Sequence, residues 1–514
     1  MTVAPPPGGV SRGTGGQSRP AVPADARPLV LAVDVGSSSV RAALFDTDGR
    51  QRPRSLARAT YAPDADDRGG VTVPLERLTG ALGETLDVLV ARAGADLERV
   101  EAAGISIFLQ SFAGLDGRSR PVGPLRTWAD TTAANEADRL GGELDEAAIW
   151  QATGAPLHPS LWPAKILALH ATDTGRRAVA YRGAPELVWR WLTGEDGCDV
   201  SIASGTGLLE RATGEWHAGL LRAVSTEPDA LPPLVGSSHA GRPSRMAADR
   251  WPVLRRVPWY PPWSDASCGN VGLGLVPVGD GVPTRAAIQI GTSSAIRSLV
   301  ATPAPRLTRG LFAHRLGDDR GLVGGQLSEG GGTLEAIARL LGRSKRSLER
   351  DARALEPGAH GLVVLPFLAG ERGPGYHARA RGALDGLRLG TSPAELYLAT
   401  VEAIALRLAE LDRRLAAALG GPPDIVASGG AVAASHLLPE LLASALRRPI
   451  RVSQEREASL RGAAIRTLVA AKLMGSESDL PEPRSSRVEP VSSHSSALAA
   501  AAGRQTELYE RLLG

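Results

Sequence analysis

The first hundred residues of the chain combine buried-strand runs with helical spacing. Residues 29–35 are apolar except for Asp34 and predict a buried strand, which the turn Gly36-Ser-Ser-Ser39 joins to a second strand over 40–45. Residues 104–109 predict another buried strand. Leucines recur at helical spacing after Pro74, at positions 75, 78, 82, 86 and 89. Strands that alternate with helices in this way are typical of an α/β fold.

The second half of the chain opens in the same way as the first. Residues 286–290 and 295–300 predict two strands that flank the turn Gly291-Thr-Ser-Ser294. The segment AAIQIGTSSAIRSL from Ala286 is a weak repeat of LAVDVGSSSVRAAL from Leu31. An internal repeat of this kind predicts two domains with similar core topology.

The remaining segments are assigned from their spacing and composition. We expect strands over 361–367 and 425–427, a long helix over 394–419, and a helix from Gly430 to about Leu446. Residues 475–494 are rich in Ser, Pro and Glu and are expected to be a linker before a helix over 498–513. Residues 1–27 are rich in Pro, Gly, Ser and Arg without hydrophobic periodicity, so we expect a disordered tail.

Composition narrows the classes of function. A chain of 514 residues, 43% hydrophobic and 22% charged, is expected to fold into two or three domains, and it lacks the apolar stretch that a membrane helix needs. The 58 basic and 55 acidic residues are spread along the chain, which argues against nucleic-acid binding. Two cysteines, Cys198 and Cys268, cannot form a disulfide framework, which favours a reducing cytoplasm. The P-loop motif and the HExxH and CxxC motifs are absent.

Three turns combine glycine with hydroxyl side chains. At the first, Gly36 permits close approach of a ligand, the N–H groups and serine hydroxyls can hold phosphate oxygens, and Asp34 can hold a hydrated Mg²⁺. A structural hairpin explains this turn equally well. Gly291-Thr-Ser-Ser294 is its counterpart, and two such turns facing each other across a cleft would clamp a polyphosphate. Ser428-Gly-Gly430 precedes a helix whose N-terminus can face a nucleotide, although ordinary strand–helix turns also contain glycine.

Other polar residues have two interpretations each. Asp265, before a glycine-rich helix start, is either a helix N-cap or a general base for a substrate hydroxyl. The segment Thr127-Trp-Ala-Asp130 either holds a polyol or is a packed tryptophan beside a turn aspartate. We interpret the pair Glu371-Arg372 and Lys165 as structural ion pairs. Three further residues are interpreted as core residues: Trp189, Trp191 and Cys268.

Eight segments in order carry a resemblance to a known family. From about Leu29 to Ala471 the chain resembles the FGGY carbohydrate kinases, and within them the gluconate kinases. The segments are DVGSSSVRAALFD from Asp34, GPLRTWADTTA from Gly123, TGAPLHPSLWPAKI from Thr153, SIASGTGLLERATGEW from Ser201, DASCGNVGLG from Asp265, IQIGTSSAIR from Ile288, LPFLAGERGPGYHARARGALDGL from Leu365 and ASGGAVAASHLLPELLASAL from Ala427.

The resemblance implies an α/β fold with two domains of the actin–hexokinase–Hsp70 type, which is ribonuclease H-like, with ATP in the cleft between them. The implied divisions are a tail at 1–27, a sugar-binding domain at 28–278, a nucleotide-binding domain at 284–474, and a linker with a terminal helix at 475–514. The implied reaction is transfer of the γ-phosphate to a terminal hydroxyl of a sugar acid, with D-gluconate as the leading acceptor. The implied state is a cytoplasmic monomer or homodimer.

The resemblance also assigns roles to residues. Asp265 matches the family's catalytic aspartate and would accept the hydroxyl proton, while Asp34 would help to hold Mg²⁺. Residues expected to bind the sugar are Gln110, Asp130, His158 and Asp265. Residues expected to bind ATP are Ser37, Ser38, Gly291, Thr292, Gly429, Gly430 and Ala431.

The sequence departs from the family around the acceptor. Many relatives have Gln-Met-His where this chain has Gln110-Ser111-Phe112, often an arginine where it has Thr132, and Asn-Asn-Gly-Gly where it has Ser328-Glu329-Gly330-Gly331. These changes keep a second hypothesis open, a kinase for a ketopentose such as xylulose or another polyol. A third hypothesis is a regulator of the same fold without catalysis. Against it, both hydroxyl turns and the two key aspartates are present.

Overall fold

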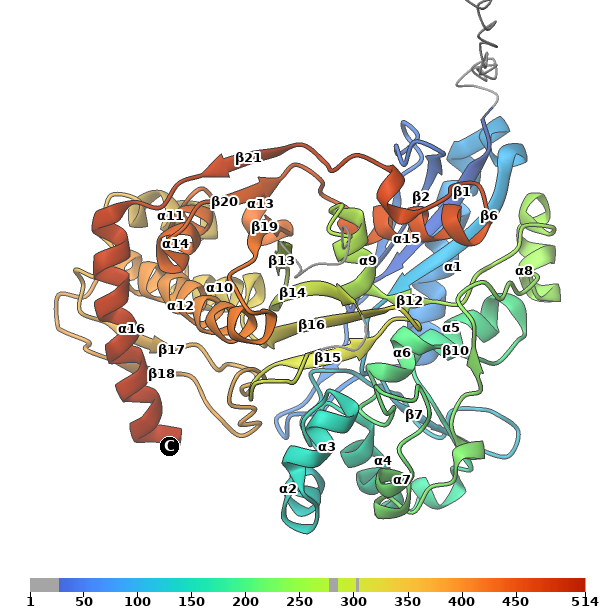
Figure 1. The fold of residues 1–514 in the computed structure, drawn as a ribbon, viewed down its shortest axis with the longest axis horizontal. Helices are drawn as coiled ribbons and strands as arrows, with labels where there is room; N and C mark the ends of the chain where they lie inside the picture. The colour runs from blue at the N-terminus through green and yellow to red at the C-terminus, as the bar shows by residue number, and fades with distance from the viewer. Residues whose placement is uncertain (1–26, 277–284, 302–304, 514) are drawn as a thin grey trace, which may run out of the picture.

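The apolar run at 29–35 forms the central strand of a five-stranded sheet in the computed structural model, which describes residues 27–276, 285–301 and 305–513 (Figure 1). The sheet order is β12-β6-β1-β2-β3, with β1 parallel to β6 and antiparallel to β2. The β1–β2 register places Asp34 opposite Arg41 at the turn end of the hairpin. The strands are β1 (Leu29–Val35), β2 (Ser39–Asp46), β3 (Ala57–Thr60), β6 (Val100–Ile107) and β12 (Trp263–Ser264).

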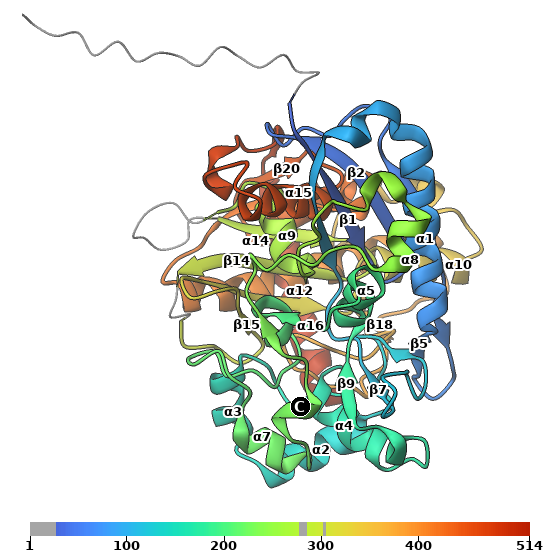
Figure 2. The same ribbon diagram turned by 90° about the vertical axis from the view of Figure 1, so that its right-hand side faces the viewer.

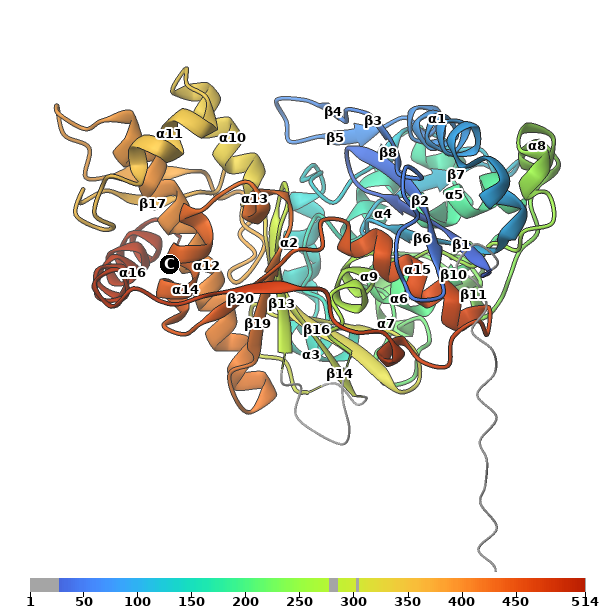
Figure 3. The ribbon, with the colours of Figure 1, turned by 90° about the horizontal axis from the view of Figure 1, so that it is seen from above.

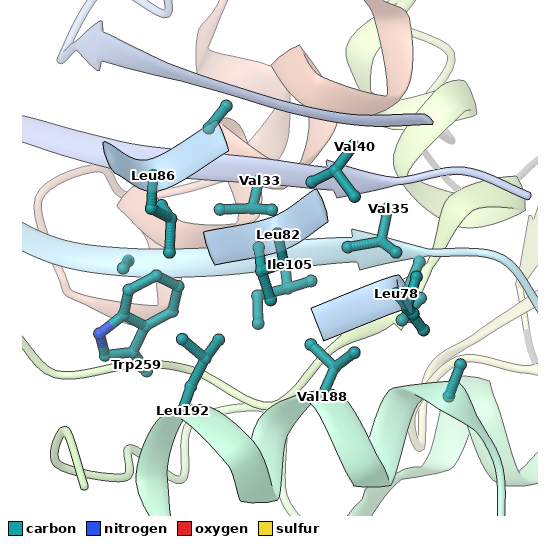
Figure 4. Close-up of a cluster of buried hydrophobic side chains, with 14 of the residues drawn as sticks. Val33, Val35, Val40, Leu78, Leu82, Leu86, Ile105, Val188, Leu192 and Trp259 are labelled. Carbon is teal, nitrogen blue, oxygen red and sulfur yellow. The ribbon is translucent and has the colours of Figure 1, made fainter. Parts of the chain in front are cut away.

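Helices cover both faces of this first sheet, which is why β1 is apolar at successive positions. Leu31, Val33 and Val35 pack against helices α1 (Leu75–Ala93) and α5 (Ala184–Thr193), as Figure 4 shows for Val33 and Val35. The leucines at 78, 82, 86 and 89 are buried on α1, as their spacing predicts. Trp189 is fully buried and Trp191 is partly buried against the same core, which confirms their interpretation.

The second sheet repeats the arrangement of the first. Its order is β15-β16-β14-β13-β19-β20-β21, with an antiparallel β13–β14 hairpin, β19 parallel to β13, and β20 parallel to β19. This topology confirms the internal repeat expected from the sequence. The strands are β13 (Arg285–Ile290), β14 (Ser294–Ala301), β15 (Phe312–Arg315), β16 (Arg320–Leu327), β19 (Asp424–Ser428), β20 (Ile450–Ser453) and β21 (Ser485–Val488).

Two helices lie between the sheets (Figure 3). Helix α9 (Asp265–Gly272) and helix α15 (Ala458–Ala470) pack against both sheets, and Cys268 is buried where α9 meets the first sheet. Glycines let the two helix backbones touch: a Cβ at Gly272 would lie 1.8 Å from the carbonyl oxygen of Ala458, and one at Gly462 would lie 1.8 Å from that of Cys268. Helix α15 follows β20 in the chain and yet covers the face of the first sheet opposite α1.

The outer layer of the second sheet is built on the long helix α12 (Pro393–Leu419), close to the range predicted. Its start is fixed by a capping box, in which Ser392 and Glu395 exchange hydrogen bonds, and its end by Gly420 in the left-handed conformation. The other elements here are α10 (Gly331–Leu340), α11 (Lys345–Ala352), α13 (Gly430–Ala433), α14 (Leu437–Leu446), α16 (Ser492–Leu513), β17 (Val363–Leu365) and β18 (Ala383–Asp385).

An inserted region between β6 and β12 extends the first half of the molecule, and its helices α2, α3, α4 and α7 occupy the lower part of Figure 2. It packs around its own apolar cluster, in which Phe112 and Trp162 are buried. Its helices are α2 (Ala134–Glu143), α3 (Glu146–Thr153), α4 (Trp162–His170), α6 (Val200–Ser204), α7 (Ala218–Ala223) and α8 (Arg245–Arg250). The small strands of the first half are β4 (Asp64–Ala65), β5 (Val71–Val73), β7 (Ala113–Leu115), β8 (Leu125–Arg126), β9 (Ala180–Arg182), β10 (Cys198–Asp199) and β11 (Leu234–Val235).

The structure corrects three expectations in the second half of the chain. The helix predicted from Gly430 to about Leu446 is broken into α13 and α14, because Ser435 caps α14 and Glu349 accepts hydrogen bonds from the N–H groups of His436 and Leu437. The expected linker at 475–494 contains β21, which pairs antiparallel with β20. The strand expected over 361–367 is limited to β17.

Some expectations fall on residues that the structure does not describe. They are the disordered tail, apart from Arg27, and the division between the two domains at 278–284. Among the helices of the described ranges, none is long and apolar enough to span a membrane.

Candidate active site

A cleft of about 1510 Å³ lies between the two sheets and brings together most of the residues expected to form the site. The two hydroxyl turns, the first residue of α9 and the Gly429 loop all line it. Ten of the predicted residues are in its wall: Asp34, Ser37, Ser38, Gln110, Asp265, Gly291, Thr292, Gly429, Gly430 and Ala431. Asp130 and His158 are the two that do not line it, and they are treated below.

The first hydroxyl turn is a tight connection between β1 and β2. The N–H of Gly36 donates to the carbonyl of Ser39 at 2.9 Å, and the hydroxyl of Tyr61 donates to the carbonyl of Gly36. Ser38 is exposed and Ser37 is half-buried at the cleft. The turn therefore presents hydroxyl groups to the cleft on a backbone that is fixed from behind.

Asp34 is buried at the end of β1 and is held from two sides. The Ser106 hydroxyl donates to one carboxylate oxygen at 2.8 Å, and the Arg41 guanidinium lies 3.2 Å from the other. Arg41 also pairs with Glu457 at 2.6 Å. Burial raises the pKa of Asp34 to about 6, against the opposing effect of Arg41. Asp34 therefore carries a carboxylate whose charge is only partly compensated by the protein.

The second hydroxyl turn is packed directly against the start of α10. The N–H of Gly331 donates to the carbonyl of Gly291 at 2.7 Å, and the N–H of Gly332 donates to that of Thr292 at 3.0 Å. A Cβ at Gly330 would lie 2.7 Å from the carbonyl carbon of Ser293, so this approach requires glycine. Gly291 and Thr292 are exposed toward the cleft.

The Gly429 loop passes over the end of β13, beside the second turn. Gly429 has a φ of 103°, and a Cβ there would lie 2.5 Å from the carbonyl oxygen of Ile290. Only glycine fits this combination of left-handed backbone and close approach. The loop directs Gly430 and Ala431 along the wall of the cleft.

Asp265 is the first residue of α9, and the residue that caps this helix is its neighbour. The Ser264 hydroxyl accepts a hydrogen bond from the N–H of Ser267 at 3.2 Å, so the N-cap interpretation of Asp265 was wrong. The Asp265 carboxylate is thereby left for the cleft. Burial raises its pKa, and the Arg297 guanidinium opposes this rise more strongly than Arg372 does. A carboxylate in such surroundings is suited to take a proton.

The strand end at Gln110 is supported by a buried lysine. The ammonium of Lys165 donates to the carbonyls of Gln110 and Thr127, each at 2.7 Å, so the expected ion pair at Lys165 is replaced by two backbone acceptors. Gln110 itself has a φ of 67° and lines the cleft. Phe112 stacks on Tyr181, and the Ser111 hydroxyl accepts from the N–H of Ala184. Two of the family departures are therefore packing residues behind the cleft.

Asp130 and His158 are buried behind the wall of the cleft. Asp130 accepts hydrogen bonds from the hydroxyl of Thr132 at 2.6 Å and from the N–H of Val71 at 3.2 Å. These contacts agree with the interpretation of Asp130 as a turn aspartate. The His158 ring nitrogen Nδ1 is 2.8 Å from the Ser160 hydroxyl. Burial, with Arg372 and Lys165 nearby, lowers the pKa of His158 to about 3, so its imidazole is neutral.

Two arginines that the sequence analysis did not assign to the cleft line its wall near Asp265. Arg297 extends from β14, and its Nη1 donates to Gln289 Oε1 at 2.7 Å. Arg372 lies over the indole of Trp128, with Cζ 4.5 Å from the ring centroid. The expected Glu371-Arg372 pair is wrong, because Glu371 pairs with Arg407 instead. The sequence pointed to these two arginines only in that both lie in segments that resemble the family.

Glu329 lies beside this group with its side chain buried. Neither carboxylate oxygen has a hydrogen-bond partner among the residues described. Burial raises its pKa to about 7, an effect that Arg407 opposes most. Glu329, one of the departures from the family pattern, therefore adds less than a full negative charge here, because a carboxyl with a pKa of about 7 is partly protonated near neutral pH.

The chain is similar to known carbohydrate kinases over most of its length. A gluconokinase of Bacillus subtilis (strain 168) is 25% identical over 457 residues, which is 86% of this chain and 87% of that protein. A xylulose kinase of Streptomyces coelicolor is 29% identical over 460 residues, 85% of this chain and 87% of that protein. The crystal structure of a gluconate kinase from Lactobacillus acidophilus superposes with a TM-score of 0.84 at 22% identity and covers 95% of this chain and 98% of the other.

Family signatures match both halves of the chain. Residues 29–272 match the N-terminal domain of the FGGY family of carbohydrate kinases, and residues 286–471 match its C-terminal domain. These matches agree with the two repeated sheets and with the cleft between them. Proteins of this family transfer phosphate from ATP to an alcohol group of a small molecule. The chain therefore belongs to the FGGY family of carbohydrate kinases.

Proposed function

We propose that this kinase is a cytoplasmic gluconokinase, which transfers the γ-phosphate of ATP to the terminal hydroxyl of D-gluconate. The observation that carries the proposal is the position of Asp265 in the same cleft as both hydroxyl turns. Asp265 lies at the start of α9, but Ser264 caps this helix, so the Asp265 carboxylate is not used as the cap. Similarity to gluconokinases over most of the chain supports gluconate as the acceptor. Xylulose and glycerol kinases at comparable identity make the choice of acceptor the point to test.

The chemistry follows from these positions. Asp265 accepts the proton of the acceptor hydroxyl while the phosphoryl group moves from ATP to the oxygen of that hydroxyl. The raised pKa of Asp265 suits this carboxylate to accept a proton. Ser37, Ser38 and Thr292 hold phosphate oxygens from opposite sides of the cleft. Gly429, Gly430 and Ala431 lie along the nucleoside. Gln110 contacts the acceptor, while Asp130 and His158 support the pocket from behind.

A divalent cation fits the observed donor set. Asp34 is a buried carboxylate, and both Asp265 and Glu457 add negative charge around it. The described residues contain no group of three or more His, Cys, Asp or Glu side chains that could hold a metal, which suits an ion bound mainly by phosphate oxygens and water. When bound, Mg²⁺ would neutralise charge on the phosphates. Asp34 would hold one of its waters.

The test is ADP release by the purified protein with Mg-ATP and a panel of D-gluconate, D-xylulose, L-ribulose, glycerol and other sugar acids. We expect turnover with gluconate that Asp265→Asn reduces at least 100-fold, the scale of a lost general base. Asp249→Asn, an exposed aspartate on α8, is the matched control and keeps full activity. Turnover with D-xylulose alone would replace the proposed acceptor. Binding of ATP without turnover of any acceptor would favour a regulator.

A further inference from the structure

Two arginines near Asp265, the buried Arg372 and the half-buried Arg297, lack a carboxylate partner. Within the described ranges, no carboxylate oxygen lies within 4.0 Å of Arg297 or Arg372, although most other buried arginines of the chain have one. The Nε atom of each is buried without a hydrogen-bond partner among the described residues. Among the described residues, the Arg372 guanidinium has one hydrogen-bond acceptor, the carbonyl of Leu327 at 3.5 Å, and the residue is 7% exposed. Both arginines line the cleft.

The surroundings do not neutralise this positive charge. Among the described residues, Asp265 is the carboxyl group that acts electrostatically on both arginines, and the proposed reaction uses it as the base. Glu329 is influenced more by Arg407 than by Arg372, and its pKa of about 7 leaves it partly protonated. Burial, with Arg297 nearby, lowers the pKa of Arg372 to about 10. Since an unpaired buried cation is costly, the arrangement is suited to an anionic ligand.

Arg372 is placed at the acceptor end of the cleft by its neighbours. It stacks on Trp128 of the sugar-binding half and acts electrostatically on both His158 and Asp265. The guanidinium lies over the indole, and both side chains line the cleft that a ligand would enter. An arginine presents a planar fork that matches a carboxylate. The position where relatives often have an arginine is Thr132 here, and its hydroxyl is used by Asp130.

We propose that Arg372, with Arg297 beside it, binds the carboxylate of a sugar-acid substrate and so selects sugar acids over neutral sugars and polyols. This proposal rests on the proposed kinase function. It deepens that function, because it names the substrate class and the residues that recognise this class. Arg372 comes from the nucleotide-binding half of the chain and Trp128 from the sugar-binding half. Binding of the acid therefore links the two halves on the acceptor side.

The same guanidinium groups could instead contact the phosphoryl group in transfer. That contact would be shared by every acceptor, whereas a carboxylate contact exists only with an acid. The test therefore compares D-gluconate with D-glucitol, a neutral polyol of the same chain length, and with D-xylulose. Arg372→Gln removes the charge and the fork, and Arg372→Lys keeps the charge alone. Arg381→Gln, an exposed arginine of the same segment, is the matched control.

We expect Arg372→Gln to lower kcat/KM for gluconate roughly 10- to 100-fold, mainly through KM, which is the range for a lost charged hydrogen bond. Its kcat/KM for the neutral acceptors should stay within about 3-fold of the wild type or rise. Arg372→Lys should lie between these limits. Titration calorimetry with gluconate alone should show the same loss of affinity. Unchanged ATP affinity and an unchanged unfolding temperature would show that the variant is folded.

Each other outcome has a definite meaning. Equal losses with acid and neutral acceptors would overturn the proposal in favour of a phosphoryl contact, and no loss with gluconate would overturn it outright. Wild-type turnover of another sugar acid, but not of gluconate, would refute gluconate as the acceptor and leave the carboxylate site standing. Wild-type turnover of neutral acceptors alone would refute both.

Discussion

Arg372 of the second half of the chain lies over Trp128 of the first, with the guanidinium carbon 4.5 Å from the centre of the indole. The contact joins the two halves at the part of the cleft where we propose that the acceptor binds. Other contacts also bridge the halves, among them Arg379 with Asp138 and Asn135, and the Trp150 indole N–H with the carbonyl of Leu311. Helices α9 and α15 join the halves on the other side.

Removal of the indole should therefore weaken acceptor binding before it affects the nucleotide. We expect Trp128→Leu to raise the KM for gluconate about 3- to 30-fold, the range that a cation–π contact supports, with little change in the KM for ATP. Steady-state kinetics measure both constants. Trp216→Leu, at a half-buried tryptophan away from the cleft, is the control for general destabilisation. An equal rise in both constants would mean that the stack positions the two halves instead.

Acidification should reduce activity in a defined range. Burial raises the pKa of Asp34 to about 6 and also raises that of Asp265, and both groups act as carboxylates in the proposed mechanism. As the pH falls through about 6, Asp34 takes up a proton and kcat/KM should decline by up to tenfold for each further pH unit, and the raised pKa of Asp265 acts in the same direction. A profile of kcat/KM from pH 5 to 8.5 checks this. A constant value down to pH 5 would contradict the proposed roles.

The buried Asp34 carboxylate should lower the stability of the folded protein. Its folded pKa exceeds the ordinary value of 3.8, so the folded state binds more protons than the unfolded state, and this group destabilises the fold as pH rises from about 4 to 6. The difference between 3.8 and about 6 corresponds to about 3 kcal/mol. We expect Asp34→Asn to increase the free energy of unfolding at pH 8 by up to that amount while it abolishes activity. Urea unfolding at pH 8 and pH 4 measures the effect on stability apart from the effect on activity. The gain in the free energy of unfolding should vanish at pH 4.

Glu329 offers a parallel case with a different consequence for activity. Its pKa rises from 4.5 to about 7 through burial, which corresponds to a penalty of about 3 kcal/mol once it is ionised. Glu329→Gln should stabilise the protein by about 1 to 3 kcal/mol at pH 8 and hardly at all at pH 4.5. Because Glu329 does not line the cleft, kcat should remain within a few-fold. A stability difference that is independent of pH would show that the carboxyl is neutral throughout.

The crossing of α9 and α15 should be intolerant of any side chain. A Cβ at Gly462 would lie 1.8 Å from the carbonyl oxygen of Cys268, so Gly462→Ala must separate the helices and shift Asp265 at the start of α9. We expect a loss of more than about 2 kcal/mol of stability, together with lower kcat. Gly503→Ala is the control, because Gly503 lies in α16 with open space around it and should gain up to about 1 kcal/mol. Thermal unfolding of both variants decides the matter.

Much of the fold was predictable because it is encoded locally. The strand at 29–35 is buried on both faces, and the helix at 394–419 carries its own capping residues, so both were found nearly to the residue. The break between α13 and α14 was missed because it depends on Glu349, which is distant in the chain. Strand β21 was missed because its side chains are mostly exposed and only its backbone pairs with β20.

The candidate site divides in the same way. The hydroxyl turns and Asp265 were found from local sequence and resemblance, and the structure brings them into one cleft. The pairing of Arg372 was not predictable, because nothing in the sequence tells that Glu371 turns to Arg407 and leaves its neighbour unpaired. The burial of Asp130 behind the wall depends likewise on Val71, 59 positions earlier in the chain.

The place of α15 has a consequence for how the protein is made. A ribosome releases β1 to β12 and α9 long before residues 458–470, so one face of the first sheet remains uncovered while about 190 further residues are synthesised. The N-terminal half therefore cannot complete its core until the C-terminal half has nearly left the exit tunnel. Truncated chains that end before α15 should expose Val30, Ala32 and Trp263 and depend on chaperones, and the two halves should not be separable as independently folding fragments.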